Sequence, residues 1–348
     1  MELGSEFNLD PKDLTIKSDN VEEYFSNFQT RWFNYGRSAI KSVNLSMDKF
    51  ILLPEFICES VIRCFSLEKV HFYKITRDFR IDFQDLFSKI DNSVGSIYIC
   101  YYFGYKQEYS KLLQLKNIAK KYKITVIEDT TQAIFSCKNI VGDVAVASLR
   151  KWFPVPQGGV LYSSNDISDM VVMPHTKSND NSRIYGMLLK DIFLKKIYDT
   201  NSMYRKIFAD CEDRVDSNST IQEISDLARF MLSCFNIDGV IAKRIRNYKR
   251  LGNFLSNRGI KYREFSDTDC PLVFPLRVKE RDSFRRYLMN NKVYCAVHWP
   301  FDNIRSNERR MAKLNADELI SLPIDQRYKD TDIDYLCDVI DKYGKDLQ

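Results

Sequence analysis

The sequence predicts an α/β protein built on a mainly parallel sheet with one antiparallel strand, plus a small C-terminal α/β domain. From about residue 20 to 163, short apolar runs rich in Ile, Val, Phe and Tyr alternate with segments of helical length. One connection in this region is too short for a crossover helix. Helical patterns then dominate, and a second set of strand-like runs follows near the end of the chain. Alternation of this kind is typical of a parallel sheet covered by helices on both faces.

The apolar runs are the candidate strands of the parallel sheet. Three of the segments between them are long enough to be crossover helices. The predicted strands are Phe50–Leu53, Val70–Tyr73, Ser96–Tyr102, Ile124–Ile127 and Val144–Ser148, and the predicted helices are Glu55–Phe65, Phe83–Ile90 and Gln107–Tyr122.

The run Gly159–Tyr162 breaks the parallel pattern. Too few residues separate it from Ser148 to form a right-handed crossover helix. We therefore expect this strand to run antiparallel. Residues 164–182 are polar and irregular, which predicts a surface loop.

The second half of the chain is expected to be mainly helical. A helical insertion is predicted near residues 183–216, with breaks near Thr200 and around residues 216–220. Apolar residues at helical spacing predict one long element, Ile224–Asn257, that bridges two domains. The small domain should contain strands at Pro271–Val278 and Val293–Val297 and helices at Arg281–Asn290 and Asp332–Tyr343. The expected domains are a large one over residues 8–235 and a small one over residues 236–348.

Composition excludes several classes of protein. The 52 basic and 47 acidic residues are interspersed, and the net charge of +5 is not gathered into a basic stripe, which argues against a nucleic-acid partner. No apolar run approaches the roughly 18 residues of a membrane span, and no secretory signal opens the chain. The nine cysteines include no CxxC pair, which fits a reducing cytoplasm. The three histidines are far apart and predict no metal site. Residues 1–7 resemble cloning-site sequence and are excluded from the expected fold.

Two strand ends carry groups that pyridoxal phosphate requires. Asp129 follows one predicted strand, Lys151 follows another, and the pair Gly158-Gly159 comes next. The cofactor needs a lysine amine to hold its aldehyde as a Schiff base and a carboxylate to keep its ring nitrogen protonated. Ligands of open parallel sheets bind at the carboxyl ends of strands. Taken singly, however, such an aspartate is commonly a helix cap and such a lysine is commonly a surface residue.

Together these residues resemble the DegT/DnrJ/StrS family of sugar aminotransferases. The resemblance is carried by Ile127–Ala133, Val141–Ser148 and Lys151 with Gly158-Gly159, and it extends over most of the chain, including Asn34–Ile40 and Leu53–Phe56. It implies the aspartate aminotransferase fold with pyridoxal phosphate as cofactor. It further implies that Lys151 forms the Schiff base and moves the proton, that Asp129 pairs with the ring nitrogen, and that Gln132 lies near the phenolic oxygen.

The resemblance also implies a phosphate site. Gly36, Arg37 and Ser38 would offer backbone amides at a helix N-terminus, and Ser148 would give a second contact. Two departures from the family fall here. Ser148 and Lys151 are three residues apart rather than five, so Arg150 could supply a phosphate contact across a shorter loop. Arg37 replaces a small hydroxyl residue and could strengthen the site through a charge-assisted bond.

Other matched positions concern the cofactor ring and the substrate. Cys58 stands where the family has an aromatic residue stacked on the ring. His298 lies in a segment that resembles the substrate entrance, and a histidine that merely caps a strand is an equal alternative. Arg327 could bind an anionic substrate, although a surface role is the more common one. Asn218 is a candidate to reach the phosphate of a partner subunit, which implies a homodimer with shared active sites.

The resemblance therefore implies an aminotransferase that moves an amino group from glutamate or glutamine to a nucleotide-linked keto-sugar, in surface-polysaccharide or amino-sugar biosynthesis. Two alternatives stay open. The same lysine and scaffold could serve another pyridoxal-phosphate reaction, such as sugar dehydration or transamination of a non-sugar ketone. The changes at Cys58 and in the loop before Lys151 also fit a non-catalytic relative.

Overall fold

The computed structural model describes residues 2–43, 45, 46, 48–167, 180–217, 220–266, 269–301 and 304–344. Its internal contacts divide the chain into two units. Unit 1 consists of Met1–Ser5, Leu45–Asp143 and Gly239–Gln348, and unit 2 consists of Glu6–Asn44 and Val144–Asp238. The domain boundary that the sequence predicts near residue 236 lies close to one border of these units, and the predicted domains stay a prediction.

Unit 1 contains four parallel strands in the order β6-β5-β3-β4. All seven residues of β5 are buried, as expected for a strand with helices over both faces. The strand bounds are β3 Phe50–Pro54, β4 Val70–Tyr73, β5 Val94–Cys100 and β6 Thr125–Asp129. The sequence predicted all four strands, and only their ends shift by up to two residues.

One of the connecting helices in unit 1 is shorter than the sequence predicted. α4 Phe83–Ser88 and α5 Tyr109–Tyr122 form as predicted, and η2 Leu67–Lys69 is a short 3-10 turn. The predicted helix Glu55–Phe65 is wrong, because only the single turn α3 Glu59–Ile62 forms. The Glu55 carboxylate instead accepts hydrogen bonds from the backbone N–H groups of Ile75 and Met311, which holds residues 55–58 out of a helix.

The C-terminal part of unit 1 has its own core. β9 Phe274–Arg277 pairs antiparallel with β11 Leu319–Leu322, and β1 Leu3–Gly4 pairs parallel with β10 Val293–Tyr294. The other elements are α10 Arg281–Asn290, η4 Ser306–Glu308, α11 Arg310–Glu318 and α12 Asp330–Tyr343. Leu3 is 1% exposed and packs into this core, so the exclusion of residues 1–7 from the fold is wrong for β1.

The predicted long helix Ile224–Asn257 is two helices, α8 Asp226–Leu232 and α9 Ile237–Ser256. The break arises because a distant residue caps α9. The Asp19 carboxylate accepts the Asp238 N–H at 2.7 Å, and the Asp19 carbonyl accepts the Ile237 N–H at 3.1 Å. A cap from so far along the chain has no local sequence signal.

Unit 2 contains three strands in the order β2-β8-β7, with β8 antiparallel to both neighbours. β7 spans Val144–Ser148 and β8 spans Gly159–Ser163, which confirms the predicted antiparallel strand. β2 Gln29–Phe33 was not predicted, because its first three residues are polar.

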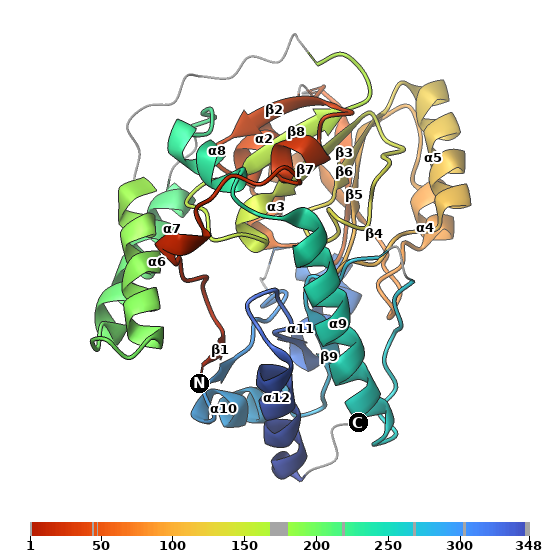
Figure 1. Ribbon diagram of the computed structural model, residues 1–348. Coiled ribbons are helices and arrows are strands. Elements are labelled where there is room, and N and C mark those ends of the chain that lie inside the picture. The colour runs from red at the N-terminus through yellow and green to blue at the C-terminus, as the bar shows by residue number, and fades with distance from the viewer. Residues whose placement is uncertain are drawn as a thin grey trace. The chain divides into compact units, whose positions relative to one another are not determined.

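The remaining elements of unit 2 are helical. They are η1 Pro11–Asp13, α1 Val21–Tyr24, α2 Gly36–Lys41, η3 Leu149–Lys151, α6 Asp180–Leu194 and α7 Asn201–Ser217. The insertion predicted near residues 183–216 is a helix pair, since α6 and α7 lie side by side (Figure 1). Most of the predicted loop 164–182 falls outside the described residues. None of the helices in the described part of the chain combines the length and apolar character of a membrane span.

Candidate functional site

Asp129 ends β6 of unit 1 as a buried carboxylate held by neutral donors. Its Oδ2 accepts the Tyr98 hydroxyl at 2.8 Å, and its Oδ1 accepts the Thr131 N–H at 2.9 Å. Burial raises the pKa of Asp129, and the bonds from Thr131 and Tyr98 oppose that rise. Among the described residues of unit 1, the groups that donate to this carboxylate carry no charge. The site can therefore pair with a cationic N–H group.

The preceding residue, Glu128, points to the opposite face of β6 and has a different set of donors. Its Oε1 accepts the N–H groups of Val141, at 2.6 Å, and of Gly142, while its Oε2 accepts the Tyr101 hydroxyl at 2.7 Å. A Cβ on Gly142 would lie 2.8 Å from the Val126 carbonyl, so only glycine permits this approach. Glu128 thus fastens the loop that leads out of β6.

Gln132 and His298 both lie beside Phe103 in unit 1. Gln132 is buried, and its side-chain oxygen accepts the Phe103 N–H at 2.9 Å. The His298 ring packs edge-on against the Phe103 ring, with centroids 6.0 Å apart, and its Nδ1 lies 2.8 Å from the Ser321 hydroxyl. His298 is partly exposed. Two residues that the sequence placed near the cofactor and the substrate are therefore linked through one residue, Gln132 through the backbone of Phe103 and His298 through its ring.

Cys58 lies at the N-terminus of α3, directly after a turn over residues 55–57 whose carbonyls accept side-chain hydrogen bonds. Arg309 donates to the carbonyls of Glu55 at 2.8 Å and Ile57 at 3.2 Å, and the Tyr102 hydroxyl donates to the Phe56 carbonyl at 2.6 Å. The Cys58 thiol is partly buried, with its Sγ 3.1 Å from a serine hydroxyl two residues on.

The thiol of Cys100 in β5 lies beside Asp129, because the parallel register pairs these two residues. Burial, followed by the Asp129 charge, raises the pKa of Cys100 well above its usual range.

Arg327 is held in unit 1 by a carboxylate. It forms a two-point ion pair with Asp325, at 2.8 and 2.9 Å, and also donates to the Ser5 carbonyl at 3.4 Å. Burial opposes ionisation of Asp325, but the charges of Arg327 and Arg244 lower its pKa. This arrangement occupies the guanidinium of Arg327 with a structural partner.

In unit 2, the start of α2 lies against the end of β7. A Cβ on Gly36 would come within 2.9 Å of the Ser148 Cβ, and a Cβ on Gly159 would come within 2.2 Å of the Tyr35 carbonyl oxygen. Gly158, at φ +151°, donates to the Asn34 carbonyl and accepts from the Leu149 N–H. Glycines are needed at 36 and 159 for close approach. They bring together the Gly36–Ser38 turn and Ser148, which the sequence assigned to one phosphate.

The side chains of Arg37 and Ser38 have partners within unit 2. Arg37 pairs with Asp216 at 2.9 Å, and the Ser38 hydroxyl lies 3.4 Å from the Thr220 carbonyl oxygen. Ser38 is buried and Arg37 is partly exposed. These contacts hold the first turn of α2 against the end of α7 and the segment that follows it. Asn218 lies in that segment, outside the described residues.

Arg150, next to Lys151, is held by the helical insertion. Glu212 of α7 forms ion pairs with both Arg150 and Arg183 of α6. Burial opposes ionisation of Glu212, yet the charges of the two arginines lower its pKa to about 2, and Lys151 acts in the same direction. Lys151 itself is exposed at the end of η3. The insertion therefore braces the short loop that carries the lysine.

One nitrogen of Arg150 has no hydrogen-bond partner in the described part of the chain. The Arg150 side chain is 13% exposed, and its guanidinium lies over the Tyr35 ring at 5.5 Å, next to Gly36. Its Nε is the buried atom without a partner among the described residues. A buried donor of this kind is costly unless an acceptor reaches it.

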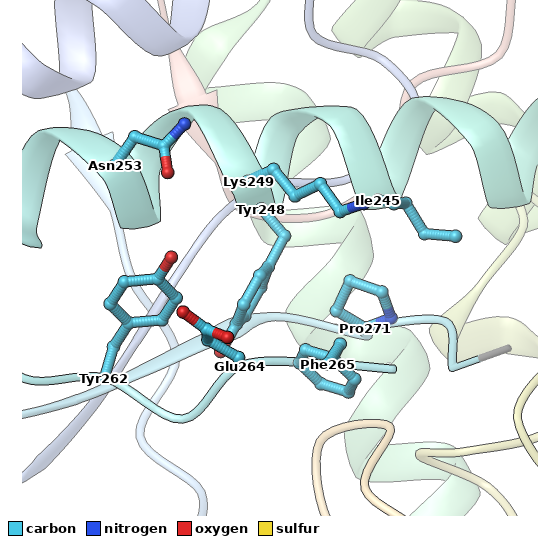
Figure 2. A pocket seen from close by; sticks show the side chains of 8 residues that line it. All are labelled: Ile245, Tyr248, Lys249, Asn253, Tyr262, Glu264, Phe265 and Pro271. Carbon is cyan, nitrogen blue, oxygen red and sulfur yellow. The ribbon is translucent and has the colours of Figure 1, made fainter. Parts of the chain in front are cut away.

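A separate pocket of about 310 Å³ lies in unit 1 (Figure 2). Four of its residues come from α9, and the others come from the chain segment that faces this helix. The lining residues are Ile245, Tyr248, Lys249, Asn253, Tyr262, Glu264, Phe265 and Pro271. None of these belongs to the predicted site. Within the described residues, no group of histidines, cysteines and carboxylates is arranged to hold a metal ion.

Sequence reasoning did not identify Tyr98 or Glu212. Tyr98 lies on the neighbouring strand, and the parallel register that pairs Cys100 with Asp129 is what brings it into reach. Strand alternation within Val94–Cys100 could have placed Tyr98 on the same face as Cys100. Glu212 had no such signal, because its role depends on how α7 packs.

The fold matches solved aminotransferase structures. The sequence matches no protein-family model and no curated protein. An aminotransferase described as DegT DnrJ EryC1 StrS, from Brucella abortus, aligns with a TM-score of 0.68 at 14% identity, covering 93% of this chain and 88% of that chain. DesV from S. venezuelae, in complex with a ketimine intermediate, aligns with a TM-score of 0.65 at 14% identity, covering 99% and 92%. The PLP form of Spr1654 from Streptococcus pneumoniae, a putative sugar aminotransferase by description, gives 0.63 at 13% identity, covering 97% and 93%. At these identities the likeness shows that the chain has the fold of these proteins.

Proposed function

We propose that this chain is a pyridoxal-phosphate-dependent aminotransferase of the DegT/DnrJ/StrS family. Its reaction would transfer an amino group from glutamate or glutamine to a nucleotide-linked keto-sugar. The observation that carries the proposal is the Asp129 carboxylate, which is buried at the carboxyl end of a parallel strand and bound by neutral donors. A protonated ring nitrogen is the cationic N–H partner that this carboxylate would take.

A second set of residues, within unit 2, fits a phosphate. The Gly36–Ser38 turn and Ser148 offer donors at one point, and the Nε of Arg150, which has no partner among the described residues, adds a charged one. Arg37 would add positive charge beside them. Pyridoxal phosphate carries both a cationic ring nitrogen and an anionic phosphate, so these two sets of residues match its two ends.

Each residue would have a defined part in the reaction. Bound at this site, pyridoxal phosphate would supply an electron sink for the substrate carbon. Lys151 would hold the cofactor aldehyde covalently and then move the proton between substrate and cofactor. Gln132 would orient the phenolic oxygen, and Cys58 would lie against the ring in place of an aromatic residue.

Substrate recognition would involve the C-terminal part of the chain. His298 is partly exposed beside Phe103, so its ring could donate to a substrate phosphate or carboxylate. Arg327 would contribute only if its guanidinium serves a second anion besides Asp325. A homodimer would complete the site through Asn218 of a second copy, and the reaction would serve amino-sugar or surface-polysaccharide synthesis in the cytoplasm.

Cofactor binding is tested by adding pyridoxal phosphate to the purified protein. The wild-type protein should acquire the visible absorbance of a lysine-bound cofactor, and Lys151→Ala should lose it. Lys120→Ala, on the exposed face of α5, is the matched control and should behave as wild type. No absorbance in the wild type, or unchanged absorbance in Lys151→Ala, would contradict the proposal and favour a non-catalytic relative.

The substrate is tested with a panel of nucleotide-linked keto-sugars, each offered with glutamate or glutamine. The expected result is amino-sugar product that depends on Lys151. Cofactor binding without amination of any keto-sugar would favour the other pyridoxal-phosphate reactions, and amination of a non-sugar ketone alone would exclude the sugar as substrate.

A further inference from the structure

Tyr98 lies on β5, and its side chain reaches the carboxyl end of β6, where Asp129 lies. The parallel register pairs Tyr98 with Ile127 and Cys100 with Asp129, so these four side chains share one face of the sheet. The tyrosine ring extends along that face toward the strand end. Its hydroxyl meets Asp129 Oδ2 at 2.8 Å. A shorter side chain at this position would not span two rows of the sheet.

The orientation of Tyr98 is fixed by its surroundings. Its side chain is fully buried, its carbonyl accepts the Tyr73 hydroxyl at 2.8 Å, and its ring packs edge-on against Phe65 with centroids 6.0 Å apart. Burial, and then the Asp129 charge, raises the pKa of Tyr98 well above its usual range. The phenol therefore remains a proton donor at every pH at which the protein would work.

We propose that Tyr98 is a positioning residue that keeps Asp129 ionised and oriented for the cofactor ring nitrogen. This inference rests on the proposed function. A donor bonded to a carboxylate favours its charged form, whereas burial favours the neutral form. Without the Tyr98 hydroxyl, the buried carboxyl would take up a proton more readily, and a protonated carboxyl cannot accept the ring N–H as an anion.

Other titratable groups near Asp129 do not replace Tyr98. The Cys100 thiol lies on the same strand and face, and its pKa is raised by burial, so it stays neutral. Thr131 donates through its backbone N–H at 2.9 Å, and its side chain also lowers the pKa of Asp129, but neither group is ionisable. Tyr98 adds to these local bonds a donor that reaches Asp129 from the neighbouring strand β5.

Tyr101 provides a matched control on the opposite face of the sheet. Tyr101 donates to Glu128 at 2.7 Å just as Tyr98 donates to Asp129 at 2.8 Å, and both tyrosines and both carboxylates are buried. Tyr98→Phe and Tyr101→Phe each delete one oxygen from the same strand region. They differ in which face of the sheet loses the bond.

The test is a titration of the protein with pyridoxal phosphate over a range of pH, with binding followed by absorbance. Tyr98→Phe should weaken cofactor affinity about tenfold or more, the usual loss for a hydrogen bond to a charged group. Its affinity should also begin to fall at a higher pH than that of the wild type as the solution is made acidic. Tyr101→Phe should leave both the affinity and its pH dependence unchanged.

A double variant distinguishes positioning from a general structural role. If Tyr98 acts through Asp129, Tyr98→Phe should cost little further affinity when Asp129→Asn is already present. Equal losses in both backgrounds, equal losses in Tyr98→Phe and Tyr101→Phe, or an unchanged affinity and pH profile in Tyr98→Phe would each overturn the inference. Failure of the wild type to bind the cofactor through Lys151 would instead overturn the proposed function, so the two failures are separable.

Discussion

The two faces of β6 carry neighbouring carboxylates with opposite relations to the rest of the protein. Glu128 receives two backbone N–H groups and the Tyr101 hydroxyl, and it fastens the loop at Val141 and Gly142. Asp129 receives the Tyr98 hydroxyl and one N–H from the residue two positions on. Burial raises the pKa of both. The bonds of Glu128 fasten the loop at Val141 and Gly142, whereas those of Asp129 come from a side chain on the neighbouring strand and from the turn that directly follows β6.

We infer from this difference that Glu128 is a structural carboxylate and that Asp129 is arranged for a ligand. The Glu128 carboxylate accepts hydrogen bonds from the backbone of a loop, so its charge stabilises the fold. The donors of Asp129 leave its negative charge without a cation among the described groups that contact it in unit 1. Substitutions of Asp129 should therefore affect mainly activity, and substitutions of Glu128 should affect mainly stability.

Asp129→Asn should produce the largest effect, on activity rather than on stability. Losing one partner of a buried charge pair costs about 3–5 kcal/mol, or roughly 150-fold to 5000-fold in turnover. Glu128→Gln is the matched isosteric control and should retain activity per folded molecule. Steady-state kinetics of the two variants checks this, and similar losses in both would erase the distinction between the faces.

Glu128→Ala should produce the largest loss of stability. It leaves the N–H groups of Val141 and Gly142 and the Tyr101 hydroxyl buried without their acceptor, at about 1–3 kcal/mol for each group. The free energy of unfolding, measured in urea, should fall by about 3–5 kcal/mol. Cofactor affinity of the folded fraction should not change, and a parallel loss of affinity would assign Glu128 to the site as well.

Two glycine substitutions sharpen the comparison further. Gly142→Ala places a Cβ 2.8 Å from the Val126 carbonyl, so it should lower stability by about 1–3 kcal/mol through strain in the Glu128 loop. Gly36→Ala places a Cβ 2.9 Å from that of Ser148 and should weaken cofactor binding more than stability. Thermal unfolding and cofactor titration of both variants measure these effects. A Gly36→Ala variant that loses stability but keeps its cofactor affinity would contradict a role of this turn in cofactor binding.

The smallest effect concerns pH. A carboxyl whose pKa is raised on folding binds its proton more tightly in the folded state, so the free energy of unfolding falls as pH rises above its ordinary pKa. For Asp129 that decline begins near 3.8 and is complete above the raised folded value. In the cofactor-free protein, Asp129→Asn should therefore lose less stability than wild type between mildly acidic and neutral pH. Urea unfolding across that range measures it, and parallel curves would contradict the assigned cause.

Much of the fold could be predicted, because the strand cores are strongly apolar. β3, β4, β6, β7 and β8 follow runs of Ile, Val, Leu and Tyr, and the short link to β8 required an antiparallel strand. The predictions failed where a distant residue decides local structure. Asp19 caps α9 across the chain, and Glu55 bonds to the N–H groups of Ile75 and Met311 instead of starting a helix.

The candidate site divides in the same way. Asp129, Lys151 and the Gly36 turn carry chemical signals in the residues themselves, and strand order places such residues at strand ends. Tyr98 and Glu212 act through packing between elements, which no local pattern records. The short loop before Lys151 was visible in the sequence, but its brace by Glu212 of α7 became apparent only from the ion pairs.

The central claim is that Lys151 holds the cofactor, and one measurement tests it most directly. The protein is incubated with pyridoxal phosphate, reduced with borohydride to fix the lysine–cofactor bond, digested, and mapped by mass spectrometry. The account predicts one modified peptide, carrying the cofactor on Lys151. Stable modification of a different lysine, or none above the level seen with Lys151→Ala, would contradict it.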